Sequence, residues 1–202
     1  MNARTERKQR SRETILQSAS RLVRERGIAR SGIAEIMEGA GLTVGGFYAH
    51  FASKQVLMDE IIRRTGAEMR ARLFARLGEK PREARAAVVL KRYLSPAHRD
   101  QEERGCPLPA VTGEIATAEV GHRDVLAEQI DLVAAELRPL LPERAGARAR
   151  HLALGLVALM IGGLTLSRAL RGTALSDDVL RACREVGQTL LHGRSPEHEE
   201  ES

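Results

Sequence analysis

The clearest hydrophobic pattern in this chain lies between residues 31 and 51, where the spacing predicts a short helix followed by a tight corner. Apolar side chains recur at i, i+3, i+4 and i+7 and form one face of a helix: Ile33, Ile36, Met37 and Ala40. Ser31 precedes this stripe and carries a hydroxyl that can cap a helix start. Gly41 follows the stripe and supplies the corner.

A second short helix is expected after this corner. Thr43 has the hydroxyl that a helix start needs, so the helix should begin at Val44 and end at about His50. Phe47 and Phe51 are expected to pack against the first helix. Two helices joined by a short turn containing Gly form a helix-turn-helix, whose second helix enters the major groove of DNA. A small helical hairpin with no ligand fits the same spacing.

The rest of the chain also has helical periodicity, and no convincing alternation of period two is found, so the expected fold class is all-α. Ser11 and Ser53 are placed to cap the helices that follow them, Gly27 ends the first of these helices, and Pro81 begins another. The remaining helices are expected over the ranges 12–26, 54–77, 81–94, 107–118, 123–141, 144–171 and 177–192.

Composition places the chain among globular proteins of a reducing compartment. Of 202 residues, 43% are hydrophobic and 29% charged, and the two cysteines are far apart in sequence, so a disulfide is not expected. The most apolar stretch, from His151 to Leu166, is shorter than the ~20 residues needed to span a bilayer. We therefore expect a buried helix and no membrane partner. The charged N-terminus lacks the apolar segment of a secretion signal, and a cytoplasmic protein is expected.

Basic charge is concentrated beside the predicted helix-turn-helix. Residues 1–30 hold nine Lys or Arg and three Glu, which gives +6, whereas the whole chain carries +5 and residues 31–202 therefore sum to −1. A basic segment next to a DNA-reading unit provides the attraction to phosphates that DNA binding requires. The alternative is a solvated, disordered basic arm, which we expect for residues 1–9.

The run from Thr14 to Ile62 resembles the TetR/AcrR family of one-component transcriptional regulators. Its most specific part is AGLTVGGFYAHFASKQVL, in which Ala40-Gly41-Leu42, Phe47-Tyr48, His50-Phe51 and Ser53-Lys54 match at fixed spacing. The resemblance implies a three-helix DNA-binding head over residues 10–52 and a helical domain over residues 53–193 that binds an effector and dimerises. The acidic tail, residues 194–202, is expected to be disordered.

Carried over by position, the resemblance implies two sets of DNA contacts. Contacts to backbone phosphates are assigned to Thr43, Tyr48, His50 and Lys54, and contacts to the groove floor to Val44, Gly45 and Gly46. Ser31 and Gly32 complete the expected DNA-binding residues. Few of these side chains can hydrogen-bond base edges, so we expect the DNA sequence to be read by Val44 against a thymine methyl and by DNA shape.

The last two expected helices carry more apolar surface than one body needs, and the resemblance implies that they form a four-helix interface in a homodimer. The residues expected in this interface are Leu156, Met160, Val179, Cys183, Val186 and Leu190. A pocket for a small-molecule effector, assigned from apolar spacing and the family layout, is expected at Met69, Leu73, Phe74, Tyr93, Cys106, Leu108 and Met160. Core packing explains most of the pocket residues equally well.

Other chemistry is not indicated by the sequence. The histidines and cysteines lack metal-ligand spacing, and no Ser-His-Asp order, paired catalytic carboxylates or Gly-rich phosphate loop is found, so no catalytic residue, metal or cofactor is expected. We expect a homodimeric repressor, not an enzyme, that binds a palindromic double-stranded DNA operator and is released by a small molecule. The alternatives are a transcriptional activator and a DNA-binding protein with no effector. A helical enzyme or an interaction bundle would need no basic head.

Overall fold

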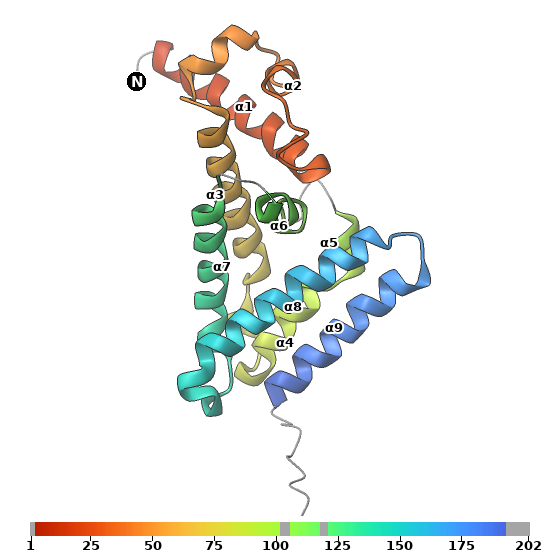
Figure 1. Cartoon of the computed structure of the whole chain (residues 1–202). Helices are drawn as coiled ribbons and strands as arrows, with labels where there is room; N and C mark the ends of the chain where they lie inside the picture. Colours follow the sequence, from red (N-terminus) through yellow and green to blue (C-terminus); the bar gives the residue numbers. More distant parts are fainter. Residues whose placement is uncertain (1–2, 102–105, 118–120, 193–202) are drawn as a thin grey trace, which may run out of the picture. The chain divides into compact units, whose positions relative to one another are not determined.

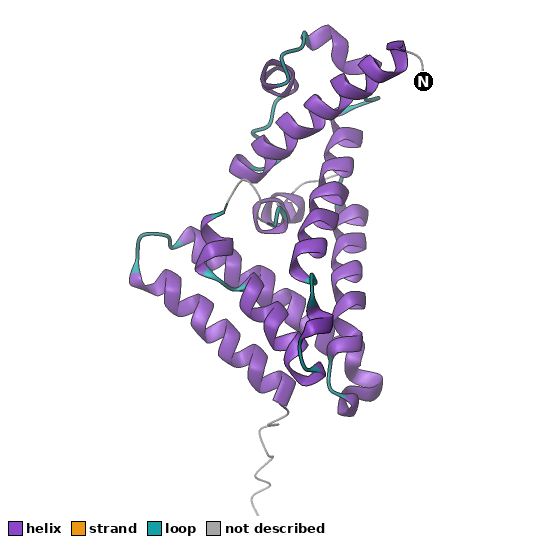
Figure 2. Ribbon diagram, turned by 180° about the vertical axis from the view of Figure 1, so that it is seen from behind, coloured by secondary structure: helices purple, strands orange, loops and turns teal. Residues whose placement is uncertain are grey.

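The computed structural model is helical throughout its described residues, which are 3–101, 106–117 and 121–192 (Figures 1 and 2). No strand occurs in these ranges, and the all-α fold class is confirmed. The α-helices in chain order are α1 (Ala3–Arg26), α2 (Ile33–Gly39), α3 (Lys54–Leu73), α4 (Arg82–Tyr93), α5 (Pro96–Asp100), α6 (Leu108–Thr117), α7 (Arg123–Leu137), α8 (Ala149–Ala169) and α9 (Ala174–His192). Short 3-10 helices are η1 (Val44–Ala49), η2 (Leu77–Glu79), η3 (Arg138–Leu140) and η4 (Glu143–Arg148). The expected acidic tail lies outside the described residues.

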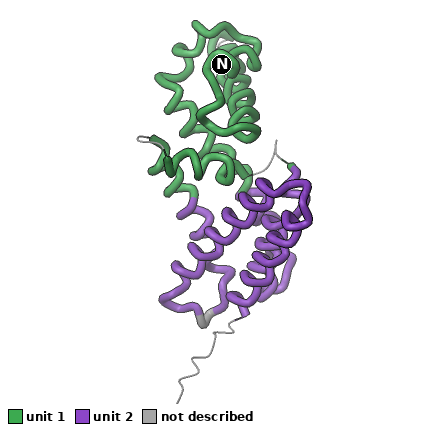
Figure 3. The backbone as a smooth tube through the Cα atoms, turned by 45° about the vertical axis from the view of Figure 1, so that its right-hand side comes forward, with its two compact units in different colours: residues 1–69, 101–129 green, residues 70–100, 130–202 purple. Residues whose placement is uncertain are grey.

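The chain folds into two compact units (Figure 3). Unit 1 consists of residues 1–69 and 101–129, and unit 2 of residues 70–100 and 130–202. The units therefore divide inside α3 and inside α7, and not at residue 52 as the sequence predicted. The reason is that the first helix does not pack only on the helix-turn-helix: within unit 1, α1 also packs on α6 and is joined to α3 by ion pairs.

The first helix is longer than the sequence predicted. It begins at Ala3, so residues 3–9, which were expected to be a disordered arm, are helical. Ser11 is consequently an interior residue of α1 and not its cap, and its carbonyl accepts a hydrogen bond from the Thr14 hydroxyl at 2.9 Å. Gly27 ends the helix as predicted, with φ +82°, a left-handed conformation that glycine adopts without steric strain.

Burial of one apolar stripe is the main force that holds α1 in unit 1. The predicted stripe is fully buried: Ile15, Ala19, Leu22 and Val23. Ion pairs to α3 add to this packing. Arg12 pairs with Glu60, and both Nη atoms of Arg64 contact the Glu13 carboxylate, at 2.5 and 2.6 Å. The Arg64 guanidinium lowers the pKa of Glu13. Such partly exposed pairs contribute only ~0–1 kcal/mol each, so they orient α3 more than they stabilise it.

Glycines allow close packing of helices in unit 2. A Cβ on Gly163 of α8 would lie 2.7 Å from the Cys183 Sγ of α9, and a Cβ on Gly187 of α9 would lie 2.8 Å from the Leu90 Cδ1 of α4. Real Cβ atoms do not approach other atoms so closely, because interiors are packed to van der Waals contact. The helices α8 and α9 therefore lie side by side at a distance that only glycine permits (Figure 1).

The segment Ala145–Ala169 has 25 residues and a mean hydropathy of 1.8, which by length and composition alone would suffice to cross a membrane. In unit 2, however, one face of α8 is buried against other helices: Ala153, Leu156, Val157, Met160 and Leu164. The burial of this face is typical of a core helix, which is what the sequence predicted for this stretch.

Several helix boundaries differ from the sequence prediction. The helix α3 ends at Leu73, earlier than residue 77, because the backbone leaves the helix and reaches a left-handed conformation at Arg76, with φ 54°. Within the range predicted for one helix, α7 ends at Leu137 and a 3-10 turn containing Pro139 follows. No helix was expected between residues 94 and 107, but Pro96–Asp100 forms α5.

Candidate nucleic-acid interface

The corner of the predicted helix-turn-helix is closed by two backbone hydrogen bonds around a left-handed glycine. Gly41 has φ +69°. Its N–H donates to the Glu38 carbonyl at 2.9 Å, and the Leu42 N–H donates to the Met37 carbonyl at 2.9 Å. This pair of bonds is the Schellman arrangement, which satisfies carbonyls that the end of α2 leaves free. The prediction that Gly41 forms the corner is confirmed.

The second element of the pair is the 3-10 helix η1, so the second helix expected from Val44 to about His50 is present, in the tighter 3-10 form. The Gly46 N–H donates to the Thr43 carbonyl at 3.0 Å, and the His50 N–H to the Phe47 carbonyl at 2.9 Å. These are i to i+3 bonds, which suit short pieces of chain. Gly45 and Gly46 each cost about 1 kcal/mol of helix propensity relative to Ala, so six residues with two glycines do not sustain an α-helix.

Aromatic packing holds η1 in place. The side chains of Phe47 and Phe51 are buried, as predicted, with their ring centroids 5.8 Å apart. The Arg12 guanidinium of α1 lies 4.8 Å from the centroid of the Phe51 ring, a cation–π contact that joins α1 to the end of this element. The packing of Phe47 and Phe51 therefore holds η1 in place, because the helix propensity of the η1 sequence is low.

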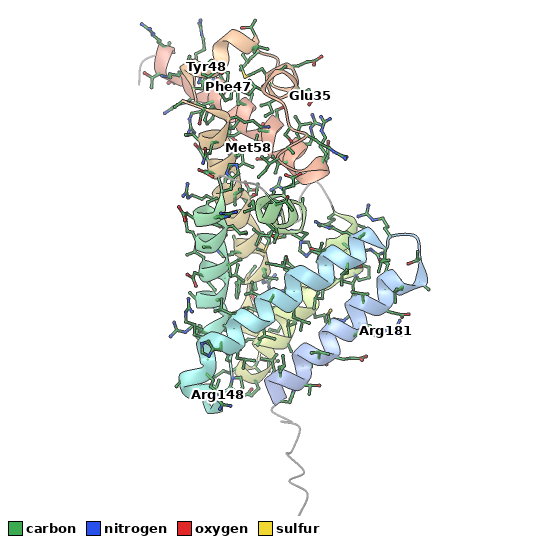
Figure 4. The ribbon with its side chains drawn as sticks, viewed as in Figure 1. Glu35, Phe47, Tyr48, Met58, Arg148 and Arg181 are labelled. Carbon is green, nitrogen blue, oxygen red and sulfur yellow. The ribbon has the colours of Figure 1, made fainter. Side chains whose placement is uncertain are left out.

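The opposite side of η1 faces solvent. Tyr48 is 68% exposed and Val44 is 50% exposed. Figure 4 labels Tyr48 beside Phe47 in this part of the chain. Thr43 and Gly45 are exposed beside Val44 and Tyr48, and a Cβ built on Gly45 would meet nothing within 4 Å. We call the surface formed by Thr43, Val44, Gly45 and Tyr48 the η1 surface. It presents the hydroxyl of Thr43, the phenol of Tyr48, the two methyl groups of Val44 and the backbone of Gly45.

Two predicted helix caps are absent from this region. The residue before α2 is Gly32, which makes no side-chain cap, whereas the Ser31 hydroxyl is fully buried and donates to the Gly27 carbonyl at 2.6 Å. The Ser31 side chain is thus turned inward, away from any phosphate. Thr43 precedes η1 in an extended conformation, and its hydroxyl makes no capping bond. The Thr43 hydroxyl therefore remains on the η1 surface.

The start of α3 follows the prediction in one respect and differs in another. Ser53 caps the helix as predicted, because its hydroxyl accepts a hydrogen bond from the Val56 N–H at 3.2 Å. The Lys54 ammonium, which was expected to reach a phosphate, donates to the Ile28 carbonyl at 3.0 Å. An ammonium has three N–H donors, so this internal bond leaves two for an outside partner.

His50 lies at the edge of the η1 surface in a basic environment. Its Nδ1 atom is buried and has no hydrogen-bond partner among the described residues. Burial lowers the pKa of the imidazole, and the positive charges of Lys8 and Arg12 lower it further. Sequence reasoning missed Lys8, because residues 1–9 were expected to be disordered. The signal was present in the i, i+4 spacing of Lys8 and Arg12, which puts both on one side of a helix that begins before residue 8.

The residues expected to form an effector pocket lie mostly in apolar cores. All are buried except Phe74, which is partly exposed. Met69, Cys106 and Leu108 belong to unit 1, and Leu73, Phe74, Tyr93 and Met160 to unit 2. A cavity of about 480 Å³ in unit 2 is lined by other residues, among them Arg82, Ala86, Leu141 and Leu191.

A second cavity, of about 470 Å³, lies in unit 1 and is polar. It is lined by Gln55, Asp59, Arg63 and residues 121–125. The His122 Nδ1 and the Asp59 Oδ1 are 2.6 Å apart across it. Over the described ranges, no three His, Cys, Asp or Glu side chains come together as metal ligands would.

The residues expected at the dimer interface divide into two groups. Leu156 and Met160 are buried inside unit 2, against other helices of the same chain, and the apolar sequence did not reveal which face of α8 packs internally. Val186 and Leu190 of α9 are 51% and 44% exposed, and Val179 and Cys183 are half-buried. Two further exposed leucines, Leu166 and Leu175, were not predicted.

Exposed small and apolar residues follow one face of each of the last two helices. At helical spacing, α8 exposes Gly155, Ala158, Gly162, Leu166 and Ala169, and α9 exposes or half-exposes Leu175, Val179, Ala182, Val186 and Leu190. We call these two rows the α8–α9 stripe. Exposed apolar runs of this kind are typical of surfaces that take part in protein–protein contacts.

Comparison with known proteins supports the sequence resemblance. Residues 15–61 match the family described as bacterial regulatory proteins, tetR family. A stretch of 52 residues is 38% identical to the HTH-type transcriptional repressor KstR2 of Mycobacterium tuberculosis and covers 26% of this chain and 26% of KstR2. The chain thus matches about a quarter of the length of these curated relatives.

Solved structures of the same fold match nearly the whole chain. A TetR-family transcriptional regulator from Cytophaga hutchinsonii superimposes with a TM-score of 0.75 at 20% identity, covering 93% of this chain and 98% of that one. Reduced NemR from E. coli gives 0.70 at 21% identity, covering 87% and 95%. A TetR transcriptional regulator from Chloroflexus aurantiacus gives 0.71 at 24% identity, covering 89% and 95%. At these identities the likeness shows the fold.

Proposed function

We propose that this chain, a TetR-type regulator by the sequence of residues 15–61 and by its fold, acts as a homodimeric transcriptional repressor that binds a palindromic DNA operator. The observation that carries the proposal is the η1 surface. There, an exposed phenol and an exposed valine are presented by a short element whose other side is fixed by Phe47 and Phe51. A phenol and a hydroxyl suit phosphate oxygens, whereas a valine suits a thymine methyl.

On DNA, the phosphates would be held by Thr43, Tyr48, His50 and Lys54, and the groove floor would lie against Val44, Gly45 and Gly46. The exposure of Thr43, Val44, Gly45 and Tyr48 supports this assignment. Gly32 stays among the proposed DNA-binding residues because its backbone groups could contact a phosphate. Ser31 is left out of this set because its side chain is buried. DNA shape would supply the rest of the sequence preference, because few of these groups hydrogen-bond base edges.

A second copy of the chain is the partner that we propose for the α8–α9 stripe. Val186 and Leu190 are large apolar side chains that lie exposed near each other on α9, and the small residues of α8 allow a helix to approach closely. A two-fold axis through this stripe would form a four-helix interface. The two heads would then reach half-sites about 34–36 Å apart, which is one turn of DNA.

Release by a small-molecule effector, in the cytoplasm, completes the proposal. Effector binding would favour a protein state with lower DNA affinity, and it can do so only through different affinities for the two states. The pocket residues that we propose are those that belong to unit 2: Leu73, Phe74, Tyr93 and Met160. The repressor role rests on the curated relative, which is a repressor by name.

Selection of duplexes from a random-sequence library by the full-length protein tests this function. We expect enrichment of an inverted repeat whose half-sites are about one helical turn apart. A library that stays unenriched after repeated rounds would rule out sequence-specific DNA binding. Thermal melts against a panel of metabolites then separate an effector-controlled repressor from an effector-independent protein, since a ligand that binds the folded state raises its stability. Transcription in vitro from a promoter that carries the selected duplex separates repressor from activator.

A further inference from the structure

The loop between α1 and α2 is held by a side chain from a distant helix. Glu114 lies on α6, and its Oε2 accepts a hydrogen bond from the Ile28 N–H at 2.7 Å and another from the Ala29 N–H at 3.2 Å. One carboxylate oxygen thus holds two successive backbone N–H groups. Hydrogen bonds to a charged group are about twice as strong as neutral ones, so this contact fixes the loop more firmly than an ordinary turn does.

The same loop is held from a second side. The Lys54 ammonium donates to the Ile28 carbonyl at 3.0 Å, so Ile28 is held by its N–H through α6 and by its carbonyl through α3. Within the loop, the Ser31 hydroxyl donates to the Gly27 carbonyl at 2.6 Å. Both Gly27, at the entry to the loop, and Ser31, two residues before α2, are therefore held by hydrogen bonds.

The carboxylate lies close against the entry to the loop. Gly27 is buried with φ +82°, a left-handed conformation that favours glycine. A Cβ at this position would overlap with Glu114 Oε1, so a larger residue here would push the carboxylate away from the loop. Because Glu114 approaches the end of α1, where the helix dipole is negative, its charge gains nothing from the helix itself. The two N–H groups are what hold it there.

We infer that Glu114 is a positioning residue of the DNA-binding head. The loop that it holds leads directly into α2, and α2 carries η1 through the Gly41 corner and the packing of Phe47. Fixing the loop therefore fixes the η1 surface relative to α1. This inference rests on the proposed function, and it makes α6 part of the working head, although α6 lies far outside residues 10–52.

The test uses the full-length protein with Glu114→Ala, Glu114→Gln and the matched control Glu128→Ala. Glu128 belongs to the same unit but pairs with Arg63 and does not touch the loop. Hydrogen exchange at the Ile28 and Ala29 amides, read by NMR, reports the contact itself. Affinity for the selected duplex and for a scrambled duplex of equal length, measured at low salt, reports its consequence. Circular dichroism verifies that each variant is folded.

We expect amide exchange at Ile28 and Ala29 to accelerate by about tenfold in Glu114→Ala, with a similar loss of affinity for the selected duplex and unchanged affinity for the scrambled one. Glu114→Gln keeps an acceptor oxygen and should restore most of the affinity. Glu128→Ala should change neither quantity. A variant that only lowered overall stability would weaken both duplexes alike.

The inference fails if exchange at the two amides is unchanged in a folded Glu114 variant, or if Glu114→Ala and Glu128→Ala bind the selected duplex equally well. Should Glu114→Ala not fold, Glu114→Gln decides alone, because the loss of the negative charge should still accelerate exchange at both amides. If the wild-type protein selects no duplex, the proposed function fails, whereas the exchange measurement still determines whether Glu114 holds the loop.

Discussion

Phe47 and Tyr48 are neighbours in the chain whose rings stand at 90° to each other, with centroids 5.2 Å apart, yet one is fully buried and the other is 68% exposed. The edge-to-face contact lets the buried ring support the exposed one. Phe47 therefore holds η1 in the core of unit 1, whereas Tyr48 is exposed and is the residue that we propose to contact a DNA phosphate.

Substitutions at these two positions should separate the stability of the fold from the affinity for DNA. Phe47→Ala should lower the free energy of unfolding by ~3–5 kcal/mol, because it removes a buried ring and leaves a cavity. Tyr48→Phe should change stability by less than ~0.5 kcal/mol but weaken binding to the selected duplex by about tenfold, through loss of one hydrogen bond to a phosphate. Urea unfolding and fluorescence anisotropy measure the two effects. Equal losses of unfolding free energy in the two variants, or full duplex affinity in Tyr48→Phe, would contradict this division.

Val44 should affect the DNA sequence that is read, and not only the strength of binding. Val44→Ala removes two methyl groups from an exposed position, so the fold should keep its stability. If the side chain meets a thymine methyl, discrimination at one base pair of each half-site should fall by ~1 kcal/mol. Affinities for a set of single-base variants of the selected duplex measure this. A Val44→Ala protein that keeps full discrimination at every position would exclude the methyl contact.

His98 should make the stability of the fold depend on pH. The pKa of its imidazole is lowered to about 4, mainly by burial and in smaller part by the charges of Arg168 and Arg72, against a hydrogen bond with the Tyr93 carbonyl that raises it. The unfolded chain, with a pKa near 6.5, binds the proton more readily. The stability that this group contributes is therefore complete above pH 6.5 and is lost as the pH falls toward about 4.

His98→Gln provides the comparison for this pH dependence. The variant should lose less of its unfolding free energy than the wild type between pH 6.5 and 4, because it has no buried base to protonate. Chemical denaturation at a series of pH values gives the difference. Parallel curves for the two proteins would mean that His98 does not titrate differently in the folded and unfolded states.

Charge placed on the α8–α9 stripe should separate the proposed dimer. Val186→Glu introduces one carboxylate per chain at an exposed apolar position, and a two-fold axis would bring two such charges into an apolar interface. Gln188→Glu adds the same charge to an exposed position of α9 off the stripe, and it serves as the control. Sedimentation velocity should show a monomer only for Val186→Glu. If both variants sediment like the wild type, the stripe is not the interface.

Local signals allowed part of this structure to be predicted from the sequence. Gly41 and the apolar spacing around Ile36 and Met37 were sufficient for the corner and the buried side of α2, because a left-handed glycine and a helical stripe act within a few residues. The same kind of signal gave a wrong prediction at Thr43. Its hydroxyl, placed before an expected helix, suggested a side-chain cap that the structure does not contain. The glycines that follow it favour a 3-10 turn instead.

Contacts between distant residues could not be predicted in this way. Glu114 and Ile28 are separated by 86 positions, and a side chain that binds backbone N–H groups leaves no pattern in the sequence of the loop it holds. Similarly, Leu156 and Met160 were placed at a dimer interface because α8 is apolar on several sides. Which side is buried depends on α4 and α9, whose packing is determined by Gly163 and Gly187.

The central claim is that two copies of the η1 surface bind one DNA duplex. Titration of the selected duplex with the full-length protein over a series of salt concentrations, with the mass of the complex determined at saturation, tests it most directly. The account predicts two chains per duplex and an association constant that falls steeply as salt rises, with a slope of about −0.9 for each phosphate contacted. Binding of a single chain, or an affinity that does not change with salt, would contradict it.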